Sequence, residues 1–531
     1  MNLEWSKPGG AVSMWAPLQH KLFRWLWLAS IASNIGTWMH EVGAGWLMTS
    51  LSSSPLIVSL VQVAAAAPMF VLALPAGAMA DIIDKRRYLL VVQSAMAVVA
   101  LSLSFLTYAG WITAPLLLLM TFLMGIGTAL TMPAWSALTP ELVPKSDLPA
   151  AISLSSVGIN VARALGPAFA GILISVIGPW ATFGINALSF FGVLTVLFFW
   201  KREPQQSVMP AERLFGAIRI GWRFAKSSRH LQRVLVRTAA FFIGASAGMS
   251  LLPILVRADL NGTAEQFGVL LGAVGIGAVT GAMVLSKVRQ LLAVNKLVAC
   301  ASLIYAFVLL LLAWIPNFYV LTPVMLVSGA AWIAVLSSLQ VAAQTSVPNW
   351  VRARALAIYI LVFFGSMAIG GAFWGWLAGV FSIPVSLSLA SVVMVAGVVV
   401  GLKATLPVLD AEDLAPSLHW PQPLLSEDAD AKRGPVMVSI EYQVLADNTE
   451  AFKLAMEEVR DMRHRNGSFS WQLMQDTQNS MKWIEVFFDE SWHDHLRHHN
   501  RVTRAELKVE SAARRFQVDG MPVQIRHFLK G

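Results

Sequence analysis

Long apolar stretches separated by short polar turns fill the first 405 residues of the chain. A helix needs about 20 predominantly apolar residues to cross the hydrocarbon layer of a membrane. By that measure the pattern predicts twelve membrane-spanning helices, at residues 22–48, 55–80, 88–108, 112–136, 150–176, 180–200, 233–257, 265–286, 293–314, 318–345, 354–380 and 383–404. We therefore expect this part of the chain to be an all-α membrane protein.

The pattern changes after Thr405. Residues 406–435 hold five prolines among acidic residues, which predicts an extended linker. In the last 96 residues, two-residue alternation predicts strands and helical periodicity predicts helices. The predicted strands are 436–444, 468–475, 481–489 and 523–528, and the predicted helices are 448–466 and 491–516. Their β-α-β-β-α-β order is that of a cytoplasmic α+β domain of the ferredoxin-like kind.

Composition narrows the class of protein. Of the 531 residues, 56% are hydrophobic and 13% are charged, and there is one cysteine, Cys300. These values exclude a soluble enzyme, a disordered chain and a secreted disulfide scaffold. The net charge of +9 comes from residues 1–405, which hold 24 Lys and Arg against 10 Asp and Glu. Because the positive excess lies in the apolar part, it indicates membrane orientation rather than a nucleic-acid partner.

Basic residues mark one side of the membrane. They follow the second predicted span and fill the loop at 201–232, whereas the loops near Ser52 and Gly178 carry none; among the alternate loops, only the one near Arg257 holds a basic residue. Since loops rich in Lys and Arg stay on the cytoplasmic side, both termini are predicted to be cytoplasmic. The N-terminus shows no pattern of a removable signal peptide.

An internal repeat divides the apolar region. A shift of 204 residues places Gly77 on Gly281, Lys85 on Arg289, Gly125 on Gly329, Gly166 on Gly370 and Gly171 on Gly375. We therefore predict two pseudo-symmetric six-helix halves, 1–200 and 233–405, joined by a basic cytoplasmic loop at 201–232. The linker at 406–435 and the domain at 436–531 follow. Such repeats are typical of transporters that bind substrate near the midplane, between their halves.

One loop of the first half resembles the loop between spans two and three of the major facilitator superfamily of transporters. The resemblance rests on five residues that form a candidate cytoplasmic gate, Gly77, Asp81, Lys85, Arg86 and Arg87, while Ile82 and Asp84 depart from the family's pattern. It implies that Asp81 holds a charge-assisted contact in one conformation and releases it in the other. The alternative is an anchor that fixes orientation without gating.

The fifth predicted span resembles its counterpart in the exporter branch of that superfamily. The residues that correspond to the antiporter glycine motif are Gly158, Gly166, Pro167 and Gly171. With the preceding Pro140–Pro144 loop, the segment is similar to the transmembrane secretion effector group, which includes the enterobactin exporter. The resemblance implies efflux across a bacterial inner membrane. The alternative is that the glycines and the proline serve only helix packing and bending.

Polar and ionisable side chains within predicted spans mark a candidate transport path, because charges inside a membrane usually face a partner or a wet cavity. Glu41 and its neighbour His40 are candidates for proton coupling; the alternative is a passive carboxylate near the headgroups. Arg163 is a candidate partner of Glu41 or of an anionic substrate group. The candidate substrate cavity comprises Asn34, Asn160, Arg163, Gln340 and Gln344, although amide side chains also hold helices together.

The C-terminal region resembles the antibiotic biosynthesis monooxygenase-like group of dimeric ferredoxin-fold proteins. Besides the element order, the resemblance rests on the segment from Ser491 to His499. His495 and His499 are one helical turn apart, a spacing that can bind a metal. Because the sequence shows no third ligand, we expect no metal, no cofactor and no catalysis here. Trp492, His495 and His499 form a weak candidate site, and we expect a regulatory role or homodimer formation.

These features predict a proton-coupled secondary exporter of small organic molecules, such as a siderophore, a drug or another metabolite, and not an enzyme. The chain contains no phosphate-binding loop, so ATP is not the predicted energy source. Two alternatives stay open. One is a membrane-anchored monooxygenase-like enzyme, and the other is a ligand sensor that keeps the transporter fold but no longer transports.

Overall fold

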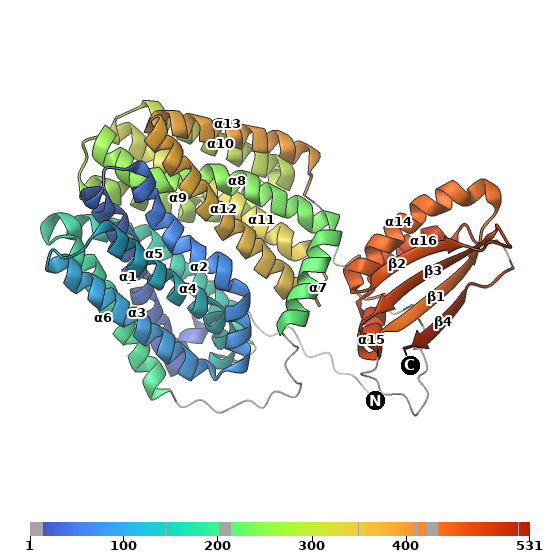
Figure 1. Ribbon diagram of the computed structural model, residues 1–531. Helices are drawn as coiled ribbons and strands as arrows, with labels where there is room; N and C mark the ends of the chain where they lie inside the picture. Colours follow the sequence, from blue (N-terminus) through green and yellow to red (C-terminus); the bar gives the residue numbers. More distant parts are fainter. Residues whose placement is uncertain are drawn as a thin grey trace. The chain divides into compact units, whose positions relative to one another are not determined.

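A computed structural model describes residues 14–144, 146–200, 214–348, 350–406, 412–417, 419–420, 434–518 and 520–530. Within these ranges, the side chains of residues 73, 74, 78, 80–82 and 214–220 lie outside the description. The chain forms two compact units (Figure 1). The first comprises residues 1–211, 237–339 and 360–405, and the second comprises residues 212–236, 340–359 and 406–531.

Long helices joined by short turns build the first unit (Figure 1). They are α1 (Lys21–Leu51), α2 (Pro55–Ile82), α3 (Lys85–Tyr108), α4 (Ala114–Leu142), α5 (Leu148–Val176), α6 (Pro179–Phe199), α8 (Arg229–Ile254), α9 (Ala264–Leu291), α10 (Val294–Trp314), α11 (Phe318–Thr345), α12 (Arg352–Val380) and α13 (Ile383–Lys403). Proline stands in the first turn of α2, α4, α5, α6 and α13, where its missing N–H costs no hydrogen bond.

Among the described residues, eleven helices are long and apolar enough to cross a membrane. The predicted first span is not among them, although α1 has 31 residues. Its apolar sequence is interrupted by Asn34, His40 and Glu41 and by three glycines. Because these residues lower its mean hydropathy, the twelfth span stays a prediction.

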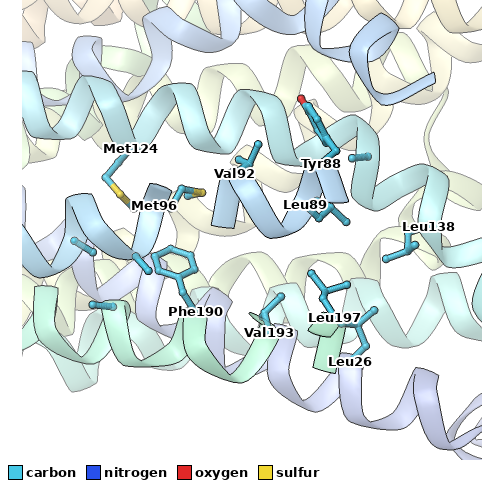
Figure 2. Packing of buried hydrophobic residues seen from close by; sticks show 14 residues of the cluster. Leu26, Tyr88, Leu89, Val92, Met96, Met124, Leu138, Phe190, Val193 and Leu197 are labelled. Carbon is cyan, nitrogen blue, oxygen red and sulfur yellow. The ribbon is translucent and has the colours of Figure 1, made fainter. Parts of the chain in front are cut away.

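Four of the six N-terminal helices share an apolar core (Figure 2). Its side chains come from α1, α3, α4 and α6 and include Leu26, Tyr88, Met96 and Phe190. The Tyr88 hydroxyl donates a hydrogen bond to the carbonyl oxygen of Leu130 at 3.1 Å, so its polar atom is satisfied inside the bundle. Because lipid is as apolar as these side chains, close packing is what holds such a core together.

Glycines that are related by the internal repeat make matching contacts with neighbouring helices. Gly125 in α4 lies against the backbone of α2, and Gly329 in α11 lies against the backbone of α9. Gly171 in α5 packs on α9, and Gly375 in α12 packs on α2. A side chain at any of these positions would collide with its neighbour, so glycine sets the close approach of the helices.

Glycines also line two opposite faces of α9. Gly268, Gly272 and Gly275 face α5, whereas Gly277 and Gly281 face α11. At 3.6 residues per turn, the two sets lie on opposite sides of the helix axis. Helix α9 is therefore in close contact with a neighbour on both sides.

The C-terminal domain forms one antiparallel sheet with helices on one face (Figure 1). Its elements are β1 (Val436–Gln443), α14 (Thr449–Asn466), β2 (Phe469–Gln475), β3 (Lys482–Asp489), α15 (Trp492–Arg501), α16 (Arg504–Arg514) and β4 (Gln524–Leu529), with strand order β2-β3-β1-β4. The inward row of β1 packs on Phe452 and Met456 of α14.

The predicted single helix at 491–516 is wrong, because two helices occupy these residues. Helix α15 ends before Val502, and a capping box formed by Thr503 and Glu506 begins α16. Each residue of the pair accepts a hydrogen bond from the backbone N–H of the other, which satisfies donors at a helix start.

Part of the predicted linker packs on the domain. The Ser417 amide donates a hydrogen bond to the Val502 carbonyl at 2.8 Å, the Arg504 amide donates to the Ala415 carbonyl at 2.9 Å, and Lys508 pairs with Asp413 at 2.8 Å. We call residues 412–417 and 419–420 the strap. Because its backbone bonds to the turn between α15 and α16, the strap belongs to the domain rather than to the linker predicted at 406–435.

The central segment predicted as a loop at 201–232 contains helix α7 (Leu214–Ser227), and α8 already begins within it. In the second unit, α7 packs against α14, and Arg223 bonds to the Glu490 carboxylate at 3.3 Å. The Arg501 guanidinium lies 4.3 Å from the centre of the Trp350 ring, in the turn between α11 and α12. Within the second unit, the C-terminal domain therefore contacts α7 and the turn between α11 and α12.

Candidate functional site

One face of α1 packs on α6. It carries Gly36, His40 and Gly43; a Cβ at Gly36 would lie 2.8 Å from the Ser189 hydroxyl oxygen. His40 is buried there, with its ring centre 4.9 Å from that of Phe183, and neither ring nitrogen has a hydrogen-bond partner. The structure therefore places His40 in the α1–α6 interface.

Glu41 lies on another face of α1, between Trp38 one turn before it and Gly45 one turn after it. Trp38 packs on Gly166 of α5, and Gly45 faces α8 and α9. The Glu41 side chain is exposed. Its position between these neighbours directs it toward the space between the N-terminal helices and α8 and α9.

Arg163 of α5 lies near the same space. Its guanidinium carbon is 5.5 Å from the centre of the Trp38 ring, and its charge attracts the Glu41 carboxylate. The Arg163 Nε is buried without a hydrogen-bond partner. Within the described ranges, no direct salt bridge joins Arg163 to Glu41. Helices α1 and α5 therefore carry opposite charges that attract each other but form no salt bridge in the described ranges.

The four amide candidates are divided between the units. Asn34 is half-buried on α1, and the Asn160 amide of α5 donates a hydrogen bond to the Ser156 carbonyl at 2.9 Å. Gln340 and Gln344 lie near the end of α11, in the second unit. The structure thus brings Asn34 and Asn160 onto the two helices that carry Glu41 and Arg163.

Two residues of the candidate gate tie helices of the first half together. The Lys85 ammonium lies 2.8 Å from the Glu141 carboxylate of α4. Arg86 donates hydrogen bonds to the Leu197 and Phe198 carbonyls at the end of α6, at 2.7 and 2.6 Å. A cation at a helix C-terminus satisfies orphan carbonyls and complements the helix dipole.

The other gate candidates differ in their surroundings. A Cβ at Gly77 would meet nothing within 4 Å. Arg87 is exposed, and its backbone amide donates a hydrogen bond to the Asp84 carboxylate, which caps α3. The Asp81 side chain lies outside the described residues.

The glycine motif brings α5 into close contact with two helices. Gly158 and Gly166 face α1, and Gly171 faces α9. A Cβ added at Gly268 of α9 would lie 2.6 Å from the Pro167 carbonyl oxygen. The motif therefore places α5 against α1 and against a helix that follows the central segment.

Further contacts, which were not predicted from the sequence, join α1 and α5 to the chain that follows the central segment. They lie at the end of these helices that carries Ser52 and Gly178. The Arg257 guanidinium donates a hydrogen bond to the Thr49 hydroxyl at 3.1 Å and lies 5.5 Å from the centre of the Trp46 ring. The Ser175 hydroxyl donates to the Glu265 carboxylate at 2.7 Å. We call these five residues the Arg257 latch. Its one signal in the sequence is Arg257, the one basic residue in a set of loops that otherwise carry no Lys or Arg.

The weak C-terminal candidates gather on α15 and β4. The Nε2 atoms of His495 and His499 are 3.2 Å apart, and Trp492 packs on His495. His527 of β4 joins them, with its ring centre 4.7 Å from that of His495. Burial lowers the pKa of His499 to about 3 and that of His527 to about 4. His527 was not among the predicted site residues, because it lies in a separate element far along the chain from the other two.

A charged network fills the interior of the same domain. The Arg463 guanidinium is fully buried, 2.9 Å from the Glu485 carboxylate and 3.3 Å from the Glu510 carboxylate. Burial alone would lower the pKa of Arg463, but these two carboxylates raise it above its usual value. The strap completes the network, because His419 and Trp420 bond to Glu510 at 2.8 and 2.9 Å.

The family model described as transmembrane secretion effector matches residues 12–531. The staphyloferrin A transporter of Staphylococcus aureus is 24% identical over 289 residues, which cover 54% of this chain and 72% of that protein. The multidrug efflux pump Tap of Mycolicibacterium fortuitum is 23% identical over 346 residues, which cover 62% of this chain and 82% of that protein.

A solved structure shares the fold. It is a bacterial homologue of the human lysosomal transporter Spinster, in an inward-facing and unoccupied conformation. It matches with a TM-score of 0.57 and 15% identity, over 74% of this chain and 96% of that one. At this identity the likeness concerns the fold alone.

Proposed function

The chain belongs to the transmembrane secretion effector family of the major facilitator superfamily, and from this premise we propose that it exports small organic molecules in exchange for protons. It is a multi-pass membrane transporter of the bacterial cell membrane. The names of its relatives, a staphyloferrin A transporter and a multidrug efflux pump, support a siderophore, a drug or a related metabolite as substrate. The family match indicates a transporter rather than the membrane-anchored enzyme considered above.

Two six-helix halves that rock against each other are the proposed mechanism. The matching contacts of Gly125 with Gly329 and of Gly171 with Gly375 support this arrangement. They also support α1 as the twelfth span, because α1 packs within the first half. In such transporters the substrate site lies between the halves and opens to one side at a time.

The placement of Glu41 and Arg163 is the observation that carries the proposal. Their charges attract each other across the space beside Trp38, without a direct salt bridge in the described part of the chain. We assign the coupling proton to Glu41. Ionised Glu41 accepts hydrogen bonds from substrate donors while Arg163 donates to substrate oxygens, and a proton on Glu41 removes its negative charge, weakens these charge-assisted bonds and releases the substrate. His40 is not assigned the proton, because it faces α6.

We propose that the end with Ser52 and Gly178 faces outward and that both termini are cytoplasmic, as the distribution of basic residues predicts. The Arg257 latch then closes the outer entrance. Asn34 and Asn160 are proposed to line the path, and the substrate role of Gln340 and Gln344 of α11 stays a prediction. Gly77, Asp81 and the basic cluster at 85–87 are proposed to control the cytoplasmic entrance.

Transport by purified protein in liposomes tests the proposal. Staphyloferrin A and ethidium serve as probes of the two substrate classes. Glu41→Gln should abolish accumulation driven by a pH gradient, because the amide carries no exchangeable coupling proton and, like protonated Glu41, holds the substrate weakly. Asp147→Asn is the control, because this carboxylate pairs with His20 outside the inter-half space. Proton-driven accumulation by Glu41→Gln equal to that of the unaltered protein would remove Glu41 from the mechanism.

We further propose that the C-terminal domain is ferredoxin-like and regulates transport. Its element and strand order support the fold. Its contacts with α7 through Arg223 and with the α11–α12 turn through Arg501 support the role, since these segments connect transport helices. We also propose a homodimer, because the group that this domain resembles consists of dimeric ferredoxin-fold proteins.

A further inference from the structure

Three histidines from two separate elements converge in the C-terminal domain. His495 and His499 stand one turn apart on α15, and His527 comes from β4, which the pairing with β1 brings beside them. One ligand nitrogen from each ring lies within 4.8 Å of the other two. His495 is buried, whereas His499 and His527 are half-buried. The cluster is therefore accessible from one side.

The hydrogen bond of His495 fixes which nitrogen faces its neighbours. Its Nδ1 bonds to the Asp489 carboxylate at 2.8 Å, so the ring donates there and its Nε2 presents a lone pair. Asp489 is itself held by the Ser468 hydroxyl at 2.6 Å. A histidine oriented by a carboxylate in this way is the usual arrangement around a metal, because the carboxylate sets the tautomer and makes the ligand more basic.

The distances suit a small cation. Metal–nitrogen bonds of 2.0–2.1 Å in tetrahedral geometry place two ligand nitrogens about 3.3 Å apart. The Nε2 atoms of His495 and His499 are already 3.2 Å apart. Among the described residues, the buried Nδ1 atom of His499 has no hydrogen-bond partner. The Nε2 atom of His499 is within hydrogen-bond distance of His495 Nε2, and a bound metal ion would replace that hydrogen bond. Trp420 of the strap packs on the His499 ring at 4.8 Å and limits its rotation.

We propose that His495, His499 and His527 bind one divalent first-row transition metal ion, with a fourth position open toward solvent. Three neutral imidazoles suit zinc, copper, iron and nickel, and they do not suit calcium or magnesium, which prefer oxygen ligands. The ion joins α15 to β4, the strand at the edge of the sheet. Asp489 is a positioning residue that acts through His495.

Metal binding by the full-length protein tests the site. The protein is purified with an affinity tag that contains no histidine. Protein stripped with a chelator should bind one equivalent of Co²⁺, with the visible absorption of a site of low coordination number, and Zn²⁺ should displace it. His499→Gln and His527→Gln should each weaken Zn²⁺ binding at least tenfold in competition with a chromophoric chelator. His493→Gln is the matched control, because His493 is exposed on the same helix.

Two outcomes would overturn the assignment. One is the absence of a stoichiometric Co²⁺ complex in the unaltered protein, a result that needs no variant and does not depend on variant folding. The other is unchanged Zn²⁺ affinity in both His499→Gln and His527→Gln. Since the assay measures binding and not transport, its result is independent of the proposed export function.

Discussion

The Arg257 guanidinium donates a hydrogen bond to the Thr49 hydroxyl, 3.1 Å away, and so connects the end of α1 to the segment that follows α8. The second contact of the latch, from Ser175 to Glu265, connects α5 to the start of α9. Both contacts cross from the N-terminal helices to the helices after the central segment. Opening at this end must break both of them.

Arg257→Gln should favour the conformation that is open at the end with Ser52 and Gly178. A hydrogen bond to a charged group contributes about 1.5–3 kcal/mol, so its loss should raise the open population roughly tenfold or more. Spin labels on Ser53→Cys and Asn261→Cys, in a Cys300→Ser background, would report this as a longer distance. Arg24→Gln at the other end of α1 is the control. An unchanged distance distribution in Arg257→Gln would show that the latch does not hold the closed state.

Gly275→Ala should destabilise the protein, whereas Gly272→Ala should be tolerated. A Cβ at Gly275 would lie 2.6 Å from the Arg163 carbonyl oxygen and from the Ala164 Cα, and backbone atoms cannot move aside cheaply. The corresponding Cβ at Gly272 finds its nearest atoms at 3.6 Å, an ordinary contact. Overpacking of this kind costs about 1–3 kcal/mol. Thermal unfolding in detergent would measure the difference, and equal stability of the two variants would contradict it.

Arg463→Leu should unfold or strongly destabilise the C-terminal domain. The substitution leaves Glu485 and Glu510 buried without their cation, and breaking a buried pair costs about 3–5 kcal/mol. Thiol labelling of Val459→Cys, a buried core position, in a Cys300→Ser background would report the loss of protection. Lys453→Leu is the control, because Lys453 is exposed on the same helix. Equal protection in the two variants would mean that the network contributes little.

The same thiol labelling of Val459→Cys should show that acid destabilises the C-terminal domain, because Glu510 takes up a proton. Burial alone would raise the pKa of Glu510, but Arg463 and the hydrogen bond from His419 lower it below its usual value. A carboxylate with a lowered pKa stabilises the folded state above its unfolded pKa, near 4.5, and this contribution is lost as the pH falls below that value. Glu510→Gln should flatten the loss of protection below about pH 4.5, whereas Glu450→Gln, at an exposed position, should leave it unchanged.

Local patterns predicted most of the elements. Apolar runs bounded by turns indicated the long helices, and alternation indicated the strands at 436–443 and 482–489. The glycine repeat pointed to positions of close helix contact, since Gly171 and Gly375 each pack on a helix of the other part. These features depend on residues close together in the chain, and for that reason the sequence carries their signal.

Features that depend on distant residues could not be predicted in this way. The strap bonds to Val502 through backbone atoms, for which no side chain is required. His527 reaches His495 only through the pairing of β1 with β4. The capping box at Thr503 and Glu506 did have a local signal, and the helical periodicity on both sides of it concealed the break. Helix α7 was likewise concealed by the positive charge of its segment.

The glycine faces of α9 limit how this transporter can move. A helix that meets α5 on one side and α11 on the other, both at backbone distance, has no room to turn about its own axis or to slide by a residue without a collision. In the proposed rocking of the two halves, α5 and α9 therefore tilt against each other, and the pivot lies beside Arg163, whose carbonyl oxygen would lie 2.6 Å from a Cβ at Gly275.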